Sequence, residues 1–553
     1  MPADDVREEV NARLAALGRD QEERLAQHRA RMLRLPYVSL TSWPLESEAL
    51  ALVPREVAAQ VGAVIFYKRG RDVRLGVVNP ARDDFAAWLA EWQVKAGVTP
   101  QLFVISRRSL VTALARYAPP TAAAAAKDEM VLDVAALSTS GARMANLEEL
   151  GQSIERISPG EILAAVVAGA LRLNASDIHV EPTREAARLR YRIDGVLHDA
   201  ATFGLEGWRR ILSRVKVLAA LKLNVRSVPQ DGSFVLKVDG QVFDVRVSTL
   251  PGAFGENVVM RLFSRQEAES FRLATLGMKE RDLAIVRAGL RQSTGMVVAA
   301  GPTGSGKTTT IAACVREVNR PELKIITLED PIEYRLPGVE QTEVDVRRGY
   351  TFAVGLRSIL RQDPDIIFVG EMRDLETAET SVHASMTGHL VFSTVHANDA
   401  AGVILRIIDL GIKPYVLAPA LNVVISQRLV RKVCTACAEP YPVTPAQREH
   451  VQQVMRGVAP DVFDPRRLAA KLTFVKARGC AVCAGTGYQG RTGVFEVFAV
   501  RDELEELVLQ GADSNAIKAA AVRGGMTTVL QDAYLKVLDQ ITTVEEVERI
   551  SEE

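Results

Sequence analysis

The sequence is poor in cysteine and in aromatic residues, and its charges cancel. Only 5% of its 553 residues are aromatic, which argues against base-stacking surfaces for nucleic acid as its main function. Lys and Arg total 68, as do Asp and Glu, so no net charge draws the whole chain to nucleic acid or to an anionic membrane. Five cysteines in a chain of this length are too few for a disulfide scaffold.

Long apolar runs are also missing. No run reaches the roughly 18 residues that a membrane-spanning helix needs, and the N-terminal MPADDVREEVNARL lacks the cationic and apolar regions of a secretory signal. For residues 162–171 and 296–301 we expect a core helix and a core strand. We therefore expect a cytoplasmic protein of roughly three or four domains that reaches a membrane only through partners.

The N-terminal part of the chain divides into three segments. Residues 1–34 are charged, with apolar residues spaced through them, which indicates an amphipathic helix that is either solvated or binds a partner. Short β-type runs at 63–68 and 73–78, followed by a helical stretch, predict a small α/β domain over residues 35–118. Two prolines and an alanine run predict a linker over residues 119–150, with local helix possible.

Two larger units follow. Over residues 151–268, the helical stretch PGEILAAVVAGALRLN precedes strand-like segments at DIHVEP, ARLRYRID, SFVLKVDG, QVFDVRVSTL and NVVMRLF. Asp239-Gly240, between the third and fourth of these segments, is a hairpin signal. Residues 269–553 contain phosphate-binding signatures and end in a helical tail over residues 498–553.

The strongest signal is a glycine-rich loop between an apolar β run and a helical sequence. The loop matches G-x-x-x-x-G-K-[ST] in full, and its residues are Gly301, Pro302, Thr303, Gly304, Ser305, Gly306, Lys307 and Thr308, followed by Thr309. Glycines allow backbone N–H groups to surround phosphate oxygens, and the helix N-terminus adds positive potential. We predict that this loop binds ATP, with Lys307 on the β- and γ-phosphates and Thr308 on Mg²⁺.

Two more apolar strands run into carboxylates, which a nucleotide motor needs to hold magnesium and polarise water. In KIITLEDPIEY the strand runs into Glu329, Asp330 and Glu333, and in DIIFVGEMRD it runs into Gly370 and Glu371. Gly370 takes the place of the usual Walker B aspartate. We therefore expect the first acidic group to complete the metal shell through water, and Glu371 to orient the attacking water.

A third β run, over residues 390–394, ends at His396. In a RecA-like sheet this strand end faces the nucleotide, so we predict that His396 senses the γ-phosphate. His389 precedes the same run, and structural and functional roles remain equally open for it.

Together these elements resemble the secretion ATPase superfamily, specifically the type II secretion and type IV pilus assembly ATPases. The matching elements are GPTGSGKTTT, TLEDPIEY, IIFVGEMRD and TGHLVFSTVHAND, with ASDIHVEP, RYRIDGVL, PQDG and DVRVSTLPGAFGENVVMRL upstream and QRLVRKVC and GRTGVFEV downstream. The resemblance covers about residues 150–553 and, weakly, 35–118. It implies an α/β fold in which a PAS-like domain precedes a RecA-like P-loop domain.

The resemblance also implies roles for four arginines. Those at the positions of Arg246 and Arg261 neutralise phosphate charge when the PAS-like domain folds over the nucleotide. Arg357 and Arg361 match a second arginine pair near the site. A planar, permanently charged guanidinium suits this task. Family members often have further arginines before PQDG, where this chain has Arg226-Ser227-Val228.

Four of the five cysteines follow the pattern C-x₂-C-x₄₂-C-x₂-C, and they are Cys434, Cys437, Cys480 and Cys483. Four thiolates suit a closed, structural zinc site, so we predict a zinc subdomain over about residues 433–485 with a helix near TPAQREHVQQVM. A redox dithiol or inert buried thiols are the alternatives, and Cys314 is expected in the core. The assembly ATPases of the resembled family carry a tetracysteine metal site that retraction ATPases typically lack, so this feature and the long N-terminal region favour an extension or secretion ATPase.

The resemblance implies a cytoplasmic ATPase, peripheral to the inner face of the cell membrane, that powers assembly of a type IV pilus or a type II secretion pseudopilus. Its expected partners are further copies in a homohexamer, an inner-membrane platform protein and a cytoplasmic docking domain of a membrane-anchored assembly protein, without direct contact to nucleic acid. One alternative is a DNA-uptake or conjugation-type motor of the same superfamily. Another is a non-hydrolysing, nucleotide-switched scaffold. The N-terminal region lacks the paired RLG-type motifs of cyclic-dinucleotide binding, so we do not predict that ligand.

Overall fold

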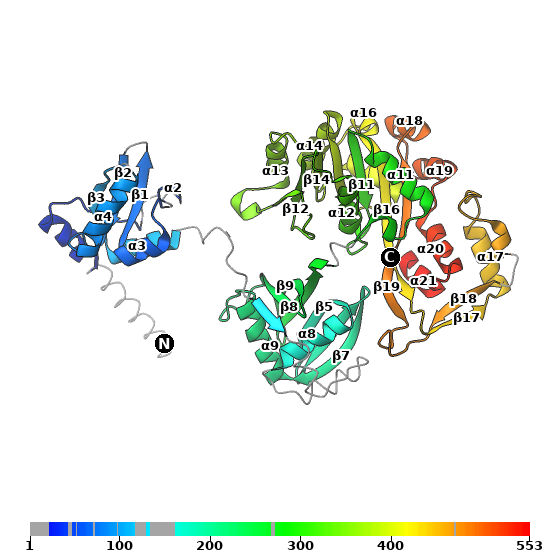
Figure 1. Ribbon diagram of the computed structural model, residues 1–553, viewed down its shortest axis with the longest axis horizontal. Helices are drawn as coiled ribbons and strands as arrows, with labels where there is room; N and C mark the ends of the chain where they lie inside the picture. Colours follow the sequence, from blue (N-terminus) through cyan, green and yellow to red (C-terminus); the bar gives the residue numbers. More distant parts are fainter. Residues whose placement is uncertain are drawn as a thin grey trace, which may run out of the picture. The chain divides into compact units, whose positions relative to one another are not determined.

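The computed structural model describes residues 22–41, 47–50, 52–69, 72–96, 98–116, 129–132, 161–266, 271–468 and 472–552 (Figure 1). The chain forms two compact units, Met1–Ala125 and Ala126–Glu553, and each is described by itself. Among the described residues, no helix is both long and apolar enough to cross a membrane.

The first unit is a small α/β domain. Its elements are a helix over residues 22–32, α2 (Ser47–Leu50), α3 (Arg55–Val61), β1 (Ala63–Arg69), β2 (Asp72–Val77), α4 (Asp83–Ala96), β3 (Gln101–Val104) and α5 (Arg107–Arg116). The sheet order is β1-β2-β3, with β1 antiparallel and β3 parallel to β2. Both predicted strands and the predicted helix are confirmed.

The described part of the N-terminal helix buries alanines rather than its larger apolar residues. Ala26 and Ala30 are buried, whereas Leu25 and Met32 are exposed. The helix is therefore confirmed over residues 22–32, but its packing contact is made by small side chains. Residues 1–21 of this prediction lie outside the described residues.

The second unit begins with a seven-stranded sheet in the order β4-β8-β9-β10-β5-β6-β7. Its elements are β4 (Glu129–Leu132), α8 (Ile162–Arg172), β5 (Ala175–Pro182), β6 (Ala186–Ile193), β7 (Val196–Gly204), α9 (Leu205–Leu218), β8 (Gln230–Val238), β9 (Gln241–Gly252) and β10 (Gly255–Ser264). Every pairing is antiparallel except that of β4 with β8. Alternate residues of the strands pack with α8 and α9 into one apolar core, so the helices cover one face (Figure 1).

This sheet confirms the predicted strands and adds two. The hairpin at Asp239-Gly240 is confirmed: both residues have positive φ, +47° and +79°, and Val238 pairs with Gln241. β7 was not predicted, because its VLHDAATFG sequence is weak in β-branched residues. β4 lies inside the predicted linker, where an edge of the sheet offers it a partner. The rest of that linker lies outside the described residues.

The second seven-stranded sheet has the order β13-β12-β14-β15-β11-β16-β19, and it is parallel except for β19. Its strands are β11 (Gly295–Ala300), β12 (Ile325–Glu329), β13 (Glu340–Glu343), β14 (Ile366–Val369), β15 (Leu390–Val395), β16 (Leu421–Val433) and β19 (Tyr488–Ala499). The four strands β11, β12, β14 and β15 are buried along their whole length. Their carboxyl ends meet at one edge, where α/β proteins bind ligands.

Helices cover both faces of this sheet. The chain forms α11 (Glu280–Leu290), α12 (Lys307–Val318), α13 (Phe352–Ile359), α14 (Leu375–Met386), α15 (Ala400–Asp409) and α16 (Pro414–Leu417), with 3-10 turns at Leu273–Thr275, Val346–Arg348 and Ala418–Ala420. α11 and α12 pack into one core, and α13, α14 and α15 pack into the other. Burial on both faces explains why these strands read as continuous apolar runs.

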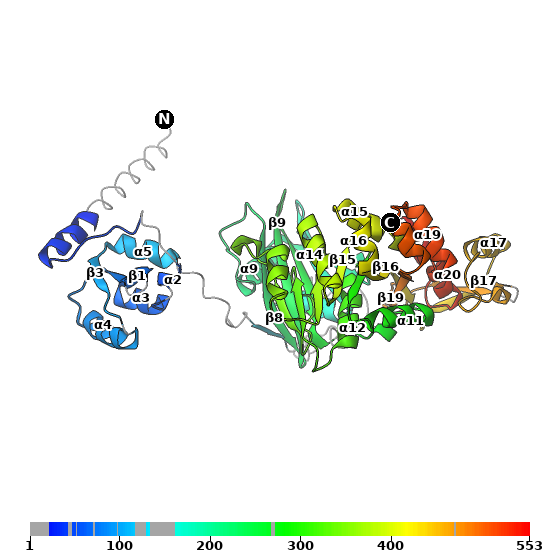
Figure 2. The same ribbon diagram turned by 90° about the horizontal axis from the view of Figure 1, so that it is seen from above.

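The C-terminal part adds a two-stranded sheet and further helices. These are β17 (Ala438–Pro442), α17 (Pro445–Val454), a 3-10 turn (Pro465–Leu468), β18 (Thr473–Ala477), α18 (Glu503–Leu509), α19 (Ser514–Arg523), α20 (Val529–Leu538) and α21 (Val544–Glu552). α17 lies beside the β17–β18 ribbon (Figure 2), which confirms the predicted helix between the cysteine pairs. Its Thr444 and Gln447 form a capping box.

Candidate nucleotide and metal sites

The phosphate loop joins β11 to α12, and its shape requires glycine. Gly301 and Gly306 have φ of +145° and +89°, which L-residues with side chains rarely adopt. A Cβ at Gly301 would lie 2.4 Å from the carbonyl oxygen of Gln427. Lys307 begins α12, and its Nζ donates to the carbonyl oxygens of Gly301 (2.7 Å) and Pro302 (3.0 Å). Burial lowers the pKa of Lys307, and the Glu371 carboxylate opposes that shift.

Strand β16 braces this loop, which the sequence did not reveal. The Thr310 hydroxyl donates to Oε1 of Gln427 at 2.6 Å, and the Gln427 side chain packs against Gly306. The next residue, Arg428, donates to the carbonyl oxygen of Asn398 at 2.9 Å. Two consecutive residues of β16 thus connect the phosphate loop with the segment that follows His396.

The first acidic group divides into one buried and two more exposed carboxylates. Glu329 is buried, and its Oε1 accepts hydrogen bonds from Thr327 (2.7 Å) and Gln341 (3.0 Å). Burial raises the pKa of Glu329, and these two hydrogen bonds oppose the shift. Asp330 lies 3.6 Å from Arg373, and Glu333 accepts from Arg246. All three carboxylates line the cavity described below.

Glu371 lies at the end of β14 with both oxygens engaged. Its Oε2 is 3.3 Å from Nε2 of His396, and its Oε1 forms an ion pair with Arg373. The side chain of Glu371 is only 15% exposed, whereas that of His396 is 55% exposed. The structure therefore brings together two predicted residues and adds Arg373, which IIFVGEMRD contains but which had no assigned role.

Gly370, at the position of the usual Walker B aspartate, sits against the neighbouring strand. A Cβ there would lie 3.2 Å from the carbonyl oxygen of Leu328 and 3.4 Å from Cα of Glu329. The Thr394 hydroxyl donates to its carbonyl oxygen at 2.7 Å. A side chain at this position would crowd the backbone of β12, which gives a packing reason for glycine.

A cavity of about 750 Å³ joins the two large domains of the second unit. The phosphate loop, Glu371 and His396 line one side, and Asp177, Arg192 and Arg261 line the other. Arg428, Arg491 and Arg549 also line it, and none of these three was predicted. Arg428 and Arg491 lie in the matching segments QRLVRKVC and GRTGVFEV, but the resemblance assigned them no role, and Arg549 lies in a helix without a local signal.

The four predicted arginines occupy three different positions relative to the cavity. Arg261 lines the cavity, and its Nε donates to Asp177 at 2.7 Å. Arg246 instead crosses to the acidic segment: it donates to the carbonyl oxygen of Ile332 (2.5 Å) and to Glu333 (3.2 Å), and its guanidinium lies over the Phe263 ring. Arg246 thus forms hydrogen bonds between the two domains.

Arg357 and Arg361 lie on the exposed side of α13 and its end, outside the cavity. Arg357 pairs with Glu376, and Arg361 donates to the carbonyl oxygen of Arg357 at 2.8 Å. His389 lies before the start of β15, away from the nucleotide edge, and its Nδ1 is 2.9 Å from the carbonyl oxygen of Ala384. That contact favours the structural role left open for His389.

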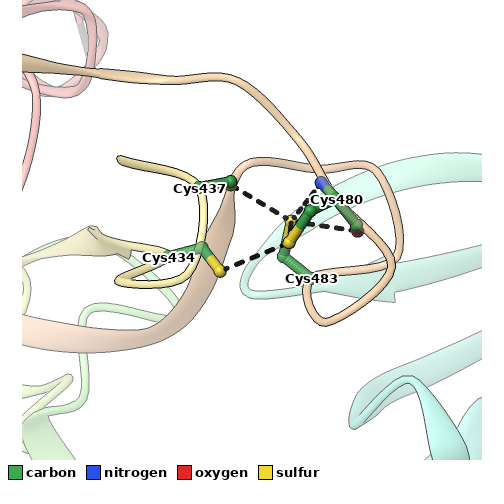
Figure 3. Close-up of side chains that lie close together, drawn as sticks. All are labelled: Cys434, Cys437, Cys480 and Cys483. Atoms are coloured by element: carbon green, nitrogen blue, oxygen red, sulfur yellow. Dashed lines mark hydrogen bonds between the residues drawn. The ribbon is translucent and has the colours of Figure 1, made fainter. Parts of the chain in front are cut away.

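The four cysteines of the two CxxC pairs converge in space (Figure 3). Their sulfurs all lie within 4.8 Å of one another, and three sulfur pairs are 3.7–3.9 Å apart. A tetrahedron with Zn–S bonds of about 2.3 Å has edges of about 3.8 Å, so the cluster fits zinc. Burial raises the pKa of Cys483, but hydrogen bonds from the N–H groups of Cys480 and Gly487 and from the thiols of Cys480 and Cys437 lower it to about 7 overall. Cys314 is buried in α12, as predicted.

Comparison with known proteins identifies the family. Residues 155–549 match the model of the type II/IV secretion system proteins. The chain belongs to this family. It is 42% identical over 422 residues to a type II secretion system protein E of Pseudomonas aeruginosa. The aligned region covers 76% of this chain and 80% of that protein. It is 34% identical over 541 residues to the type IV pilus assembly ATPase PilB of Myxococcus xanthus. Here the aligned region covers 97% of this chain and 93% of that protein.

Two further comparisons concern parts of this secretion ATPase family member. Residues 33–124 match the MshEN domain. The structure of the Legionella pneumophila ATPase DotB superposes with a TM-score of 0.50 over 72% of this chain and 96% of that chain, at 19% identity. That likeness supports the fold alone. The predicted α/β fold class and the predicted family are thereby confirmed.

Proposed function

We propose that this protein hydrolyses ATP and uses the energy to assemble a type IV pilus or a type II secretion pseudopilus. The observation that carries the proposal is the pairing of Glu371 with His396 in a cavity that also holds the phosphate loop and arginines of a second domain. Such a cavity can orient water, bind phosphate and couple both events to domain motion. The relatives named above are a secretion protein and a pilus assembly ATPase.

Each side chain then has a defined task. Lys307 leaves the carbonyl oxygens of its own loop and binds the β- and γ-phosphates. Glu371 exchanges one of its present partners for the attacking water, and His396 reports the γ-phosphate. Thr308, with water held by the Glu329 segment, would hold Mg²⁺, which neutralises phosphate charge when bound. Loss of the γ-phosphate weakens the arginine contacts and allows the two domains to separate.

The proposal includes an assembly and a location. As a homohexamer on the cytoplasmic face of the membrane, the protein would act on an inner-membrane platform protein. The first unit would dock to a cytoplasmic domain of a membrane-anchored assembly protein. Arg357, exposed on α13, and Arg361, exposed just after it, are available to a neighbouring subunit in such a ring. The four cysteines would hold a structural zinc that fixes the β17–β18 subdomain.

The test is Mg-ATPase activity of the purified, zinc-loaded chain, with native mass recorded on the same samples. We expect hexamer-sized particles whose turnover falls at least about 100-fold in Glu371→Gln. Glu379→Gln, an exposed residue of α14 outside the cavity, is the matched control and should retain activity. Equal, negligible turnover in the wild type and Glu371→Gln, with ATP bound in both, would favour the nucleotide-switched scaffold instead.

A further inference from the structure

Four charged residues form one row across the antiparallel sheet. The register pairs Arg246 of β9 with Arg261 of β10. It also pairs Arg261 with Asp177 of β5, and Asp177 with Arg192 of β6. Paired residues of neighbouring strands point to the same face. Since the alternate residues of these strands pack with α8 and α9, this charged row lies on the opposite face.

Asp177 holds two arginines at once. Its side chain is 5% exposed, Oδ1 accepts from Nε of Arg261 at 2.7 Å, and Oδ2 lies 3.4 Å from Nε of Arg192. The Ser176 hydroxyl donates to Oδ2 at 2.8 Å. In both ion pairs the nearest arginine nitrogen is Nε, so Asp177 engages at most one of the five N–H groups of each guanidinium. Both guanidinium groups therefore retain donors for a further anion.

The charge balance of the row favours such an anion. Three arginines face one aspartate within the row, and Glu333 offsets Arg246 at 3.2 Å. Arg192 and Arg261 are left to share Asp177, which gives a surplus of one positive charge. Both residues line the cavity that contains Lys307.

We propose that Arg192 binds the phosphate chain of the nucleotide together with Arg261, and that Asp177 positions both guanidinium groups. The proposal rests on the proposed ATPase function and adds two residues to it. The turn that follows Arg192 is docked on the opposite domain, because Asp194 accepts from the Gly490 backbone N–H at 2.9 Å. Arg192 also donates to the carbonyl oxygen of Gly195 at 3.0 Å, so it couples this docked turn to the phosphate site.

The first test measures binding of the non-hydrolysable analogue Mg-AMP-PNP to the full chain by calorimetry, at several salt concentrations. Arg192→Gln should weaken binding about tenfold, as expected for a lost charge-assisted contact, and should make the affinity less dependent on salt. The matched control is Arg190→Gln, which breaks the Arg190–Glu181 pair on the same two strands, outside the cavity. A role of Arg192 in bracing the turn alone would weaken binding without changing the salt dependence, and that result would overturn the phosphate contact.

The second test separates positioning from charge by steady-state kinetics. Asp177→Asn removes a negative charge near the phosphates, so KM should stay the same or fall. The two arginines lose their common anchor, so kcat should fall about tenfold. Glu181→Gln is the control and should resemble the wild type. A wild-type kcat in folded Asp177→Asn would refute the positioning role. If that variant does not fold, the comparison of AMP-PNP binding by Arg192→Gln and Arg190→Gln still tests the phosphate contact. Absence of turnover in the wild type would count against the proposed function and leave the AMP-PNP result valid.

Discussion

The two seven-stranded sheets of the second unit build one cavity in different ways. The parallel sheet is buried on both faces and contributes from its strand ends: the phosphate loop after β11, Glu371 after β14 and His396 after β15. The antiparallel sheet is covered by helices on one face and contributes from within its strands, through Arg192 and Arg261. Segments that follow strand ends, together with Arg428 of β16 and Arg491 of β19, thus supply one wall of the cavity, and a cross-strand row of side chains supplies the other.

This difference predicts different sensitivities. A loop at a strand end depends on local backbone shape, whereas a row depends on register and on shared ion pairs. A glycine-to-alanine substitution in the cavity wall formed by the parallel sheet should therefore abolish ATP turnover. The same substitution in the antiparallel sheet should only reduce its stability. The four changes below follow this comparison in order of decreasing effect.

Gly301→Ala should have the largest effect. The new Cβ would lie 2.4 Å from the carbonyl oxygen of Gln427 at a φ of +145°, so the phosphate loop must move. We expect ATP turnover to fall at least about 100-fold, measured by phosphate release. Gly349→Ala, at a φ of +75° with no heavy atom within 4 Å of the new Cβ, is the control and should keep its turnover. Wild-type turnover in Gly301→Ala would mean that the loop tolerates displacement.

Cys480→Ser should release the metal and destabilise the β17–β18 subdomain by several kcal/mol, because binding of a structural metal contributes directly to folding. Metal content by mass spectrometry and limited proteolysis of the subdomain measure the two effects. Cys314→Ser, in the buried core of α12, should lose stability but retain the metal. One zinc bound per Cys480→Ser chain would contradict the four-ligand site.

Asp282 lies on α11 and, like Asp177, is a buried aspartate. Burial raises the pKa of Asp282 to about 7; Asp532 adds to the shift, and Lys536, Arg281 and Lys279 oppose it. Because the folded-state pKa exceeds the unfolded value, the folded state holds its proton more tightly. The free energy of unfolding should therefore decrease as pH rises from about 4 through 7, by up to a few kcal/mol.

Asp282→Asn mimics the protonated group and should remove this dependence. Its stability relative to the wild type should increase between pH 5.5 and 8, as measured by chemical denaturation at both pH values. Asp461→Asn, an exposed neighbour of Arg281, is the control and should show no such trend. Parallel pH profiles for the wild type and Asp282→Asn would refute the prediction.

Gly240→Ala should have the smallest effect and completes the comparison with Gly301. Its φ is +79°, and no heavy atom lies within 4 Å of the new Cβ, so only backbone strain remains. We expect a loss of about 1 kcal/mol in unfolding free energy with unchanged ATP turnover. Loss of turnover in this variant would show that the β8–β9 hairpin communicates with the cavity.

Most of the cavity wall formed by the parallel sheet could be predicted from the sequence, because each of its parts is a contiguous stretch of residues. An apolar strand followed by glycines or by a carboxylate identifies both the strand and the edge at which its last residue lies. Asp177 and Arg192 lie in the matching segments ASDIHVEP and RYRIDGVL, but their shared site could not be predicted in this way. They meet Arg261 only through the register of three strands, which no local pattern encodes. Gln427 was missed for the same reason: its role depends on packing against Gly306.

Strand β16 runs from Leu421 to Val433 and ends directly before Cys434. Gln427, beside the phosphate loop, therefore lies on the strand that leads directly into Cys434 of the cysteine cluster. The residue that packs against the phosphate loop and the first cysteine of the cluster are thus seven positions apart, so the candidate nucleotide site and the candidate metal site share one structural element.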